Sequence, residues 1–205
     1  MPLKAPIVVE SSRLIVRPVE ECDLQSLLAV NGDDEATRFL PYASWRSLAD
    51  GHAWFERMSI LAARGESIQY VITDKASALA IGTCLLFRYE ETSARAELGY
   101  VLGRKYWGRG IMREALVALI DCAFSGYGLR RLEAEVDPQN TASVLLLDSL
   151  GFAREGLLRR RWVDKGVAHD TIIYGLLNDE WHSGNRTANT NANGNSIGGA
   201  GSRRS

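Results

Sequence analysis

The amino-acid sequence predicts a single α/β domain, in which helices cover the faces of a mixed, mostly antiparallel sheet of six to seven strands. The first observation is that segments with alternating apolar residues are interspersed with segments whose apolar residues recur every three or four positions. The second is that several strand patterns are separated only by short turns, which favour antiparallel neighbours. The chain has 205 residues, and one domain is the expected number at this length.

The first half of the chain predicts one strand, two helices and a three-stranded meander. In order, these are a strand at residues 13–18, helices at 20–31 and 47–64, and strands at 68–73, 80–89 and 95–102. Pro18 closes the first strand, and Gly65 stops the second helix.

The second half predicts a helix, a strand, a helix and a final pair of strands. In order, these are a helix at residues 108–125, a strand at 132–136, a helix at 141–150, and strands at 152–163 and 167–176. In the first of these helices Ile111, Ala115 and Leu119 recur every four residues, as expected for one buried face. Asn140 is placed to cap the second helix and Gly151 to end it.

Residues 182–205 differ in composition from the rest of the chain, because they are rich in Asn, Gly and Ser. Such a segment buries too little apolar surface to offset the entropy of ordering it, so we expect a disordered tail after a domain of residues 1–181. The formal net charge of the chain is −1, and leaving out the three tail arginines gives about −4 for the domain. A mildly acidic domain predicts no nucleic-acid partner.

The cysteines indicate neither a metal site nor a redox centre. Cys22, Cys84 and Cys122 have no metal-binding spacing and stand in apolar surroundings that are typical of core positions. We therefore expect no metal. The chain shows no basic-then-apolar leader and no apolar run of about 18 residues. These features predict a cytoplasmic protein without a membrane partner.

The stretch from Leu98 to Met112 carries the strongest indication of a ligand. A predicted strand leads into a loop with Gly103, Gly108 and Gly110, and this loop opens the long helix. The first N–H groups of a helix lack an intrahelical partner and lie at the positive end of its dipole, and glycines let the backbone approach an anion closely. The pattern predicts a diphosphate site at the start of the helix.

Two other phosphate motifs fit this stretch less well. A dinucleotide-binding fingerprint needs a third glycine where Arg113 stands, and the Gly-Lys-Ser/Thr of a P-loop is absent. A glycine turn without any ligand remains the alternative.

A series of motifs extends this pattern along the chain. They are Ala96-Glu-Leu-Gly-Tyr-Val-Leu, Tyr106-Trp-Gly-Arg-Gly-Ile-Met-Arg-Glu-Ala-Leu, Arg131-Leu-Glu-Ala-Glu-Val-Asp-Pro-Gln-Asn-Thr-Ala-Ser, Leu150-Gly-Phe and Glu155-Gly. In these motifs the chain resembles the GNAT acetyltransferases, specifically the RimJ/RimL-type branch that includes the N-terminal acetyltransferases of ribosomal proteins. The resemblance covers about residues 10–181. The family's pyrophosphate loop usually starts with Gln or Arg, and Lys105 stands at that position here.

The resemblance implies a GNAT-like domain that binds acetyl-CoA as cosubstrate where the sheet opens, near residues 98–102 and 133–137. Tyr100, Val101 and Leu102 would run beside the pantetheine arm, and Asn140 would hydrogen-bond its amides. The residues expected around the phosphates are Trp107, Gly108, Arg109, Gly110, Ile111 and Met112.

Acyl transfer to an amine needs a base for the ammonium, donors for the oxyanion and a hydrogen bond to the departing thiolate. Some members of the family have a glutamate base where Glu135 stands, and Glu97 on the preceding strand is the second candidate. A water, or no dedicated base, is the third possibility. Glu133 and Glu135 share one strand face, and the alternative for both is pairing with arginines across the sheet.

The leaving thiolate needs a different group from the one that many relatives use. These relatives place a tyrosine in the helix after the asparagine, but Leu147 stands at that position and cannot donate a hydrogen bond. In the RimL-like pattern a serine one turn after the asparagine hydrogen-bonds the CoA sulfur, and Ser143 fits this pattern. The alternative is that Ser143 only lines the first turn of its helix.

The resemblance implies direct attack of a primary amine on the thioester, and no cysteine is placed as a nucleophile. The leading hypothesis for the acceptor is the N-terminal α-amine of a protein, and the enzyme alternative is a small amine such as an amino acid, a polyamine or an aminoglycoside. A non-catalytic acyl-CoA-binding module is the remaining alternative. The family includes monomers and homodimers, and the sequence does not choose between them.

Overall fold

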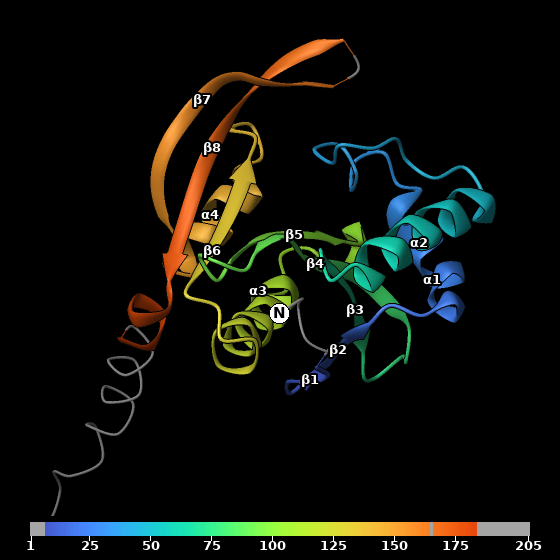
Figure 1. The fold of residues 1–205 in the computed structure, drawn as a ribbon. Coiled ribbons are helices and arrows are strands. Elements are labelled where there is room, and N and C mark those ends of the chain that lie inside the picture. Colours follow the sequence, from blue (N-terminus) through green and yellow to red (C-terminus); the bar gives the residue numbers. More distant parts are fainter. Residues whose placement is uncertain (1–6, 165, 184–205) are drawn as a thin grey trace, which may run out of the picture.

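The computed structural model describes residues 7–164 and 166–183, which form a single α/β domain (Figure 1). Its sheet has eight strands in the order β1-β2-β3-β4-β5-β6-β8-β7, so the predicted count of six to seven is wrong by a small margin. The missed strand is β1, Val9–Glu10. Two residues are too short for a recognisable alternation, and only their pairing with Val16 and Ile15 of β2 defines them as a strand.

The other elements follow the predicted order. The strands are β2 Leu14–Pro18, β3 Ile68–Asp74, β4 Ala80–Glu90, β5 Arg95–Leu102, β6 Arg131–Val136, β7 Ala153–Asp164 and β8 Val167–Leu177. The α-helices are α1 Leu24–Asn31, α2 Leu48–Ala63, α3 Ile111–Asp121 and α4 Thr141–Ser149. Short 3-10 turns at Glu21–Asp23 and Arg104–Tyr106 precede α1 and α3, and a wider π turn at Cys122–Gly126 ends α3.

The helix predicted over residues 108–125 begins three residues later than expected, at Ile111. Gly108 and Gly110 have φ angles of 67° and 69°, which lie in the left-handed region and cannot continue a right-handed helix. Gly110 therefore precedes the helix as its N-cap.

The sheet opens between β5 and β6, as the family resemblance implies. These strands are the parallel pair of the sheet, and their pairing ends at Glu97 and Glu133. Beyond this point β5 continues along β4 to Leu102, and β6 continues along β8 to Val136. The edge of β5 that faces β6 is therefore left without a strand partner from Leu98 onward among the described residues.

Two hydrophobic cores cover opposite faces of the sheet. On one face Leu98 and Leu102 of β5 pack into the core that contains the buried side of α3. On the other face Val101 packs with Trp54 of α2 and Trp45. Because side chains alternate along a strand, Glu97 and Val101 face α1 and α2, whereas Tyr100 faces the α3 side, where it packs on that core.

Helix α2 is held by its cap and by aromatic packing. Ser47 and Asp50 form a capping box at its start. Trp54 is buried against Trp45, with ring centroids 5.4 Å apart. Gly51 lets the Trp45 ring approach, because a Cβ at this position would lie 3.0 Å from that ring. Helices α1 and α2 pack on each other and over β4 and β3, in the half of the sheet away from the β7–β8 hairpin (Figure 1).

The chain after β8 forms a helical segment over residues 178–183, in which Trp181 is buried and donates from Nε1 to Asp121 Oδ1 at 2.6 Å. The predicted tail of residues 182–205 therefore begins inside this segment, and the rest of the tail lies outside the described residues. Cys84 and Cys122 are buried as expected, but Cys22 is exposed. Across residues 7–164 and 166–183, every helix is too short or too polar to cross a membrane.

Candidate active site

The loop between β5 and α3 has the geometry of an anion site. Two of its three glycines, Gly108 and Gly110, take left-handed conformations that other residues adopt only with strain. The backbone N–H groups of residues 108–112 donate to no acceptor among the residues that the structure describes. A Cβ on Gly108 would meet no atom within 4 Å, so the space beside this glycine is open. The protein's own side chains therefore do not occupy the amides that the sequence assigned to a diphosphate.

The side chains of this loop divide between the core and the surface. Ile111 and Met112 are buried, so only their backbone amides are available to a ligand. Arg109 and Trp107 are exposed. The indole of Trp107 turns back to β5, where its Nε1 donates to the Leu102 carbonyl at 2.8 Å. This bond ties the start of the loop to the end of the open strand.

The open edge of β5 leads from this loop into the interior of the domain. Val101 and Leu102 are buried, and Tyr100 is half-buried. The Tyr100 hydroxyl is fully buried and makes no hydrogen bond within the described part of the chain. A buried hydroxyl without a partner is unusual in a folded protein, and it provides a polar atom for a ligand in the sheet opening.

Helix α4 brings Ser143 toward this hydroxyl. Asn140 caps the helix, because its Oδ1 accepts a hydrogen bond from the Ser143 backbone N–H at 3.2 Å. Burial raises the pKa of Tyr100 to about 12, and the nearby Ser143 side chain opposes that increase. The structure thus brings three predicted residues together on the α3 side of the opening.

The two candidate bases meet on the other face of the sheet, around the guanidinium of Arg88. Arg88 Nη1 lies 2.6 Å from Glu97 Oε2 and 3.2 Å from Glu135 Oε1. Glu97 is buried, and this burial raises its pKa although the hydrogen bond from Arg88 opposes the increase. A carboxyl group with a raised pKa is a better proton acceptor near neutral pH than an ordinary glutamate.

Glu135 has further partners on the β7–β8 hairpin. Trp162 donates from Nε1 to Glu135 Oε2 at 2.8 Å, and Arg161 Nη2 lies 3.4 Å from Oε1. The guanidinium carbon of Arg88 lies 5.6 Å from the centroid of a Trp162 ring, which adds a cation–π contact. The hairpin is therefore attached to the candidate bases through Glu135.

The pairing with arginines that the sequence left open is confirmed as a contact pattern. Glu133 lies 2.7 Å from Arg95 and 2.8 Å from Arg131, in addition to the contacts of Glu135. The sequence analysis expected no arginine partner for Glu97, but Glu97 pairs with Arg88. These pairs do not decide which carboxylate acts as a base.

The sequence analysis assigned no catalytic or binding role to Arg88, Arg161 or Trp162. Arg88 reaches both carboxylates from an irregular step of β4, where the register shifts between Phe87 and Glu90. Its φ of 49° is unusual for a residue other than glycine. A bulge of this kind has no sequence signal, because it depends on pairing between strands.

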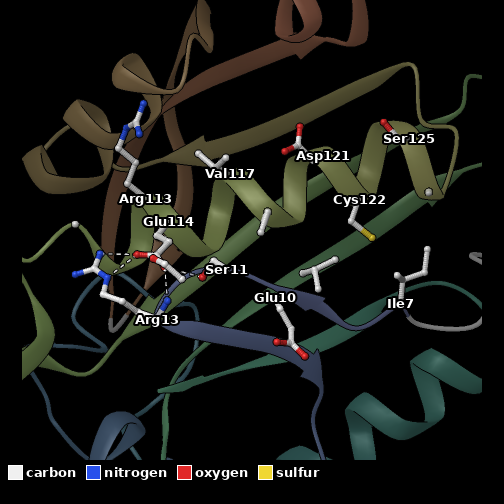
Figure 2. Close-up of a pocket in the computed structure, with 15 residues that line it drawn as sticks. Ile7, Glu10, Ser11, Arg13, Arg113, Glu114, Val117, Asp121, Cys122 and Ser125 are labelled. Carbon is white, nitrogen blue, oxygen red and sulfur yellow. Dashed lines mark hydrogen bonds and ion pairs between the residues drawn. The ribbon is translucent and has the colours of Figure 1, made fainter. Parts of the chain in front are cut away.

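A separate open groove of about 940 Å³ lies on the far side of α3, between this helix and the β1–β2 segment (Figure 2). Its lining includes Ile7, Val9, Val117 and Cys122, and at one end Gly110. None of the candidate catalytic side chains lines it. Within the described residues, no cluster of three or more His, Cys, Asp or Glu side chains is placed to hold a metal ion.

Comparison with known proteins connects this geometry to a family. The family model described as "Acetyltransferase (GNAT) domain" matches residues 13–153. The uncharacterized N-acetyltransferase p20 of Bacillus licheniformis is 34% identical over 171 residues, which cover 83% of this chain and 96% of that protein. The [ribosomal protein uS5]-alanine N-acetyltransferase of Escherichia coli strain K12 is 34% identical over 87 residues, 42% of this chain and 45% of that protein.

A solved structure shows the same fold at lower identity. The spermidine N-acetyltransferase of Vibrio cholerae, solved in complex with CoA and spermine, superposes with a TM-score of 0.74 at 20% identity. The match covers 84% of this chain and 99% of that one.

Proposed function

The chain belongs to the GNAT acetyltransferase family and is an acetyl-CoA-dependent N-acetyltransferase, and from this premise we propose that its acceptor is the N-terminal α-amine of a protein. The observation that carries the proposal is the pairing of three glutamates near the sheet opening with arginines. These pairs join Glu97 to Arg88, Glu133 to Arg95 and Arg131, and Glu135 to Arg88 and Arg161.

The charge around the opening favours an acceptor with a single ammonium group. A polyamine carries several positive charges and needs unpaired carboxylates along its length, whereas Arg88 and Arg161 present positive charge here. An N-terminal α-amine carries one charge at the end of a neutral backbone. The partial similarity to the uS5-alanine N-acetyltransferase supports the same choice.

Acetyl-CoA supplies an activated thioester, and this chain's residues would bind and orient it in the opening. The unpaired amides of residues 108–112 fit a diphosphate, and the open edge of β5 from Leu98 to Leu102 fits an extended amide-containing arm. The orphan hydroxyl of Tyr100 lies along the same path. Trp107 and Arg109 would border the phosphates, and Asn140 would border the arm.

We assign the role of general base to Glu97 rather than to Glu135. Both carboxylates contact Arg88, but Glu135 also accepts a hydrogen bond from Trp162 and pairs with Arg161, so both of its oxygens already have partners. Glu97 contacts Arg88 through one oxygen, and burial raises its pKa. Glu97 would take the ammonium proton directly or through a water.

Ser143 would donate a hydrogen bond to the departing sulfur from the face opposite to Glu97. The Asn140 cap uses the backbone N–H of Ser143 and does not need its hydroxyl, which lies near the Tyr100 hydroxyl. A base on one face and a donor on the other match a reaction in which the amine approaches from one side and the thiol leaves on the other.

The test is a thiol-release assay with acetyl-CoA and a panel of acceptors. The panel holds peptides with free N-termini, the same peptides with blocked N-termini, amino acids, spermidine and an aminoglycoside. We expect turnover with the free peptides and none with the blocked ones. Faster turnover with spermidine or the aminoglycoside would refute the proposed acceptor. Tight CoA binding without turnover across the panel would instead favour a non-catalytic acyl-CoA-binding module.

A further inference from the structure

The turn between β1 and β2 is clamped onto the first turn of α3 by the carboxylate of Glu114 (Figure 2). Glu114 Oε1 accepts hydrogen bonds from Ser11 Oγ at 2.6 Å, Ser12 Oγ at 3.0 Å and the Arg13 backbone N–H at 2.9 Å. Glu114 Oε2 accepts from Arg13 Nε at 2.6 Å and lies 2.6 Å from Arg13 Nη2. Arg13 is thus held through both its backbone N–H and its guanidinium by a single carboxylate about a hundred residues further along the chain.

The remaining nitrogen of the Arg13 guanidinium reaches the glycine loop. Arg13 Nη1 donates to the backbone carbonyl of Arg109 at 3.0 Å. Arg13 Nη2 also lies 3.8 Å from the position that a Cβ on Gly110 would take. The guanidinium therefore packs against the loop from the β1–β2 side.

This contact determines how one peptide group of the loop is oriented. The Arg109 carbonyl and the Gly110 N–H belong to the same peptide group, and the described chain has no cis peptide bond. In a trans peptide the carbonyl and the N–H point in opposite directions. Because Arg13 draws the carbonyl to the β1–β2 side, the Gly110 N–H points away from that side.

We propose that Arg13 is a positioning residue for the cosubstrate: by holding the Arg109 carbonyl, it keeps the Gly110 amide directed at the diphosphate of acetyl-CoA. The inference rests on the diphosphate site of the proposed function. It assigns a role in the site to the β1–β2 turn, which lies outside the loop itself. The guanidinium also adds positive charge behind the loop, but positioning depends on its fork geometry and not on charge alone.

The clamp keeps its charged form at neutral pH. Burial by itself would raise the pKa of Glu114, but the hydrogen bonds from Ser11, Arg13 and Ser12 outweigh it and lower the pKa to about 2. Glu114 is therefore ionised at neutral pH, and Arg13 has a permanent partner.

The test measures CoA affinity by calorimetry, without turnover, for the variant Arg13→Met. Methionine keeps an unbranched apolar stem but removes every donor. We expect the dissociation constant for CoA to rise about tenfold, as for the loss of one or two hydrogen bonds to a charged group, with kcat at saturating acetyl-CoA within about twofold of the wild type. The melting temperature of the free protein is recorded for each variant.

Two further variants separate positioning from charge and from general stability. Arg13→Lys keeps the charge, but an ammonium cannot span Glu114 and the Arg109 carbonyl as a guanidinium does, so we expect weakened CoA binding here too. The matched control is Lys75→Met. Lys75 holds the same turn by donating to the Ser11 carbonyl at 2.8 Å and pairing with Glu10, without contacting the glycine loop. We expect wild-type CoA affinity for this control.

A double-mutant cycle provides the sharpest readout. Glu114→Gln removes the charged partner of the Arg13 guanidinium, so we expect this variant to bind CoA more weakly than the wild type. We expect the double variant, Arg13→Met with Glu114→Gln, to bind CoA no more weakly than Arg13→Met alone. Additive losses would mean that the two residues act separately and would contradict the clamp.

The failure of this inference differs from the failure of the proposed site. If Arg13→Met lowers the melting temperature but binds CoA as the wild type does, Arg13 is only structural and the inference is wrong. Full CoA affinity in Arg13→Lys would assign the effect to charge and would also overturn positioning. If Arg13→Met does not fold, the lysine variant and the cycle partner Glu114→Gln decide the question. A Gly110→Trp variant that still binds CoA would refute the diphosphate site itself.

Discussion

The two faces of the sheet opening are built in different ways. The α3 side uses backbone amides from one continuous loop, residues 108–112, whose conformation depends on two glycines. The α2 side uses charged side chains from four strands, with Arg88 of β4 between Glu97 of β5 and Glu135 of β6, and Arg161 of β7 beside them. A loop of backbone donors suits a ligand common to a whole family, whereas a cluster of side chains can change with the acceptor.

The largest expected effect tests the loop. Gly110→Trp places a bulky side chain at a left-handed position of the loop, and we expect CoA affinity to fall by at least about 100-fold in calorimetry. Gly128→Trp is the matched control, because Gly128 has a φ of 70° and open space around it but lies outside the loop. If both variants fold and bind CoA equally well, the loop of residues 108–112 is not the binding site for the diphosphate.

The next effect tests the α2 side. We expect Glu97→Gln to lower kcat by about 100-fold with the best peptide acceptor, because a general base contributes about that much or more. A base must be deprotonated, and burial raises the pKa of Glu97, so wild-type activity should fall with decreasing pH at a higher pH than an ordinary glutamate would cause. The glutamine variant should lose this decrease. If Glu135→Gln loses this decrease in activity at low pH and Glu97→Gln keeps it, Glu135 is the general base and Glu97 is not.

A smaller effect tests the charge argument for the acceptor. Arg88→Met leaves Glu97 and Glu135 without their shared cation, and we expect the KM for spermidine to fall by about tenfold relative to that for a peptide. Arg88 opposes the increase in the pKa of Glu97, so its removal should also move the acid limb of the kcat/KM profile to higher pH. Unchanged discrimination between spermidine and peptide would show that Arg88 does not set the acceptor class.

The smallest effect concerns the leaving thiol. Ser143→Ala removes the hydroxyl but keeps the helix cap, because Asn140 accepts from the backbone N–H of Ser143. We expect kcat to fall by about five- to tenfold with CoA affinity unchanged, as for one hydrogen bond. Steady-state kinetics and calorimetry on the same preparation give the two values. Turnover at the wild-type rate would remove Ser143 from the mechanism and leave the Tyr100 hydroxyl as the donor to examine.

The sequence by itself determined the fold class and the glycine loop, and its family resemblance implied the opening between β5 and β6. The first two features depend on local periodicity and on glycines such as Gly108, which short stretches of the chain contain. The strand β1 was missed because two residues are too few to show an alternation of apolar and polar side chains. The start of α3 was placed too early because Gly108 and Gly110 adopt left-handed conformations that the sequence pattern does not reveal.

Only the tertiary structure decided which side chains meet. Arg88 comes to Glu135 across 47 positions and Arg13 to Glu114 across 101, through a strand bulge in one case and a turn against a helix in the other. Such contacts depend on strand register and helix placement, which no local pattern encodes. The physical reason is that backbone conformation follows from neighbouring residues, whereas the partner of a charged side chain follows from how distant elements pack.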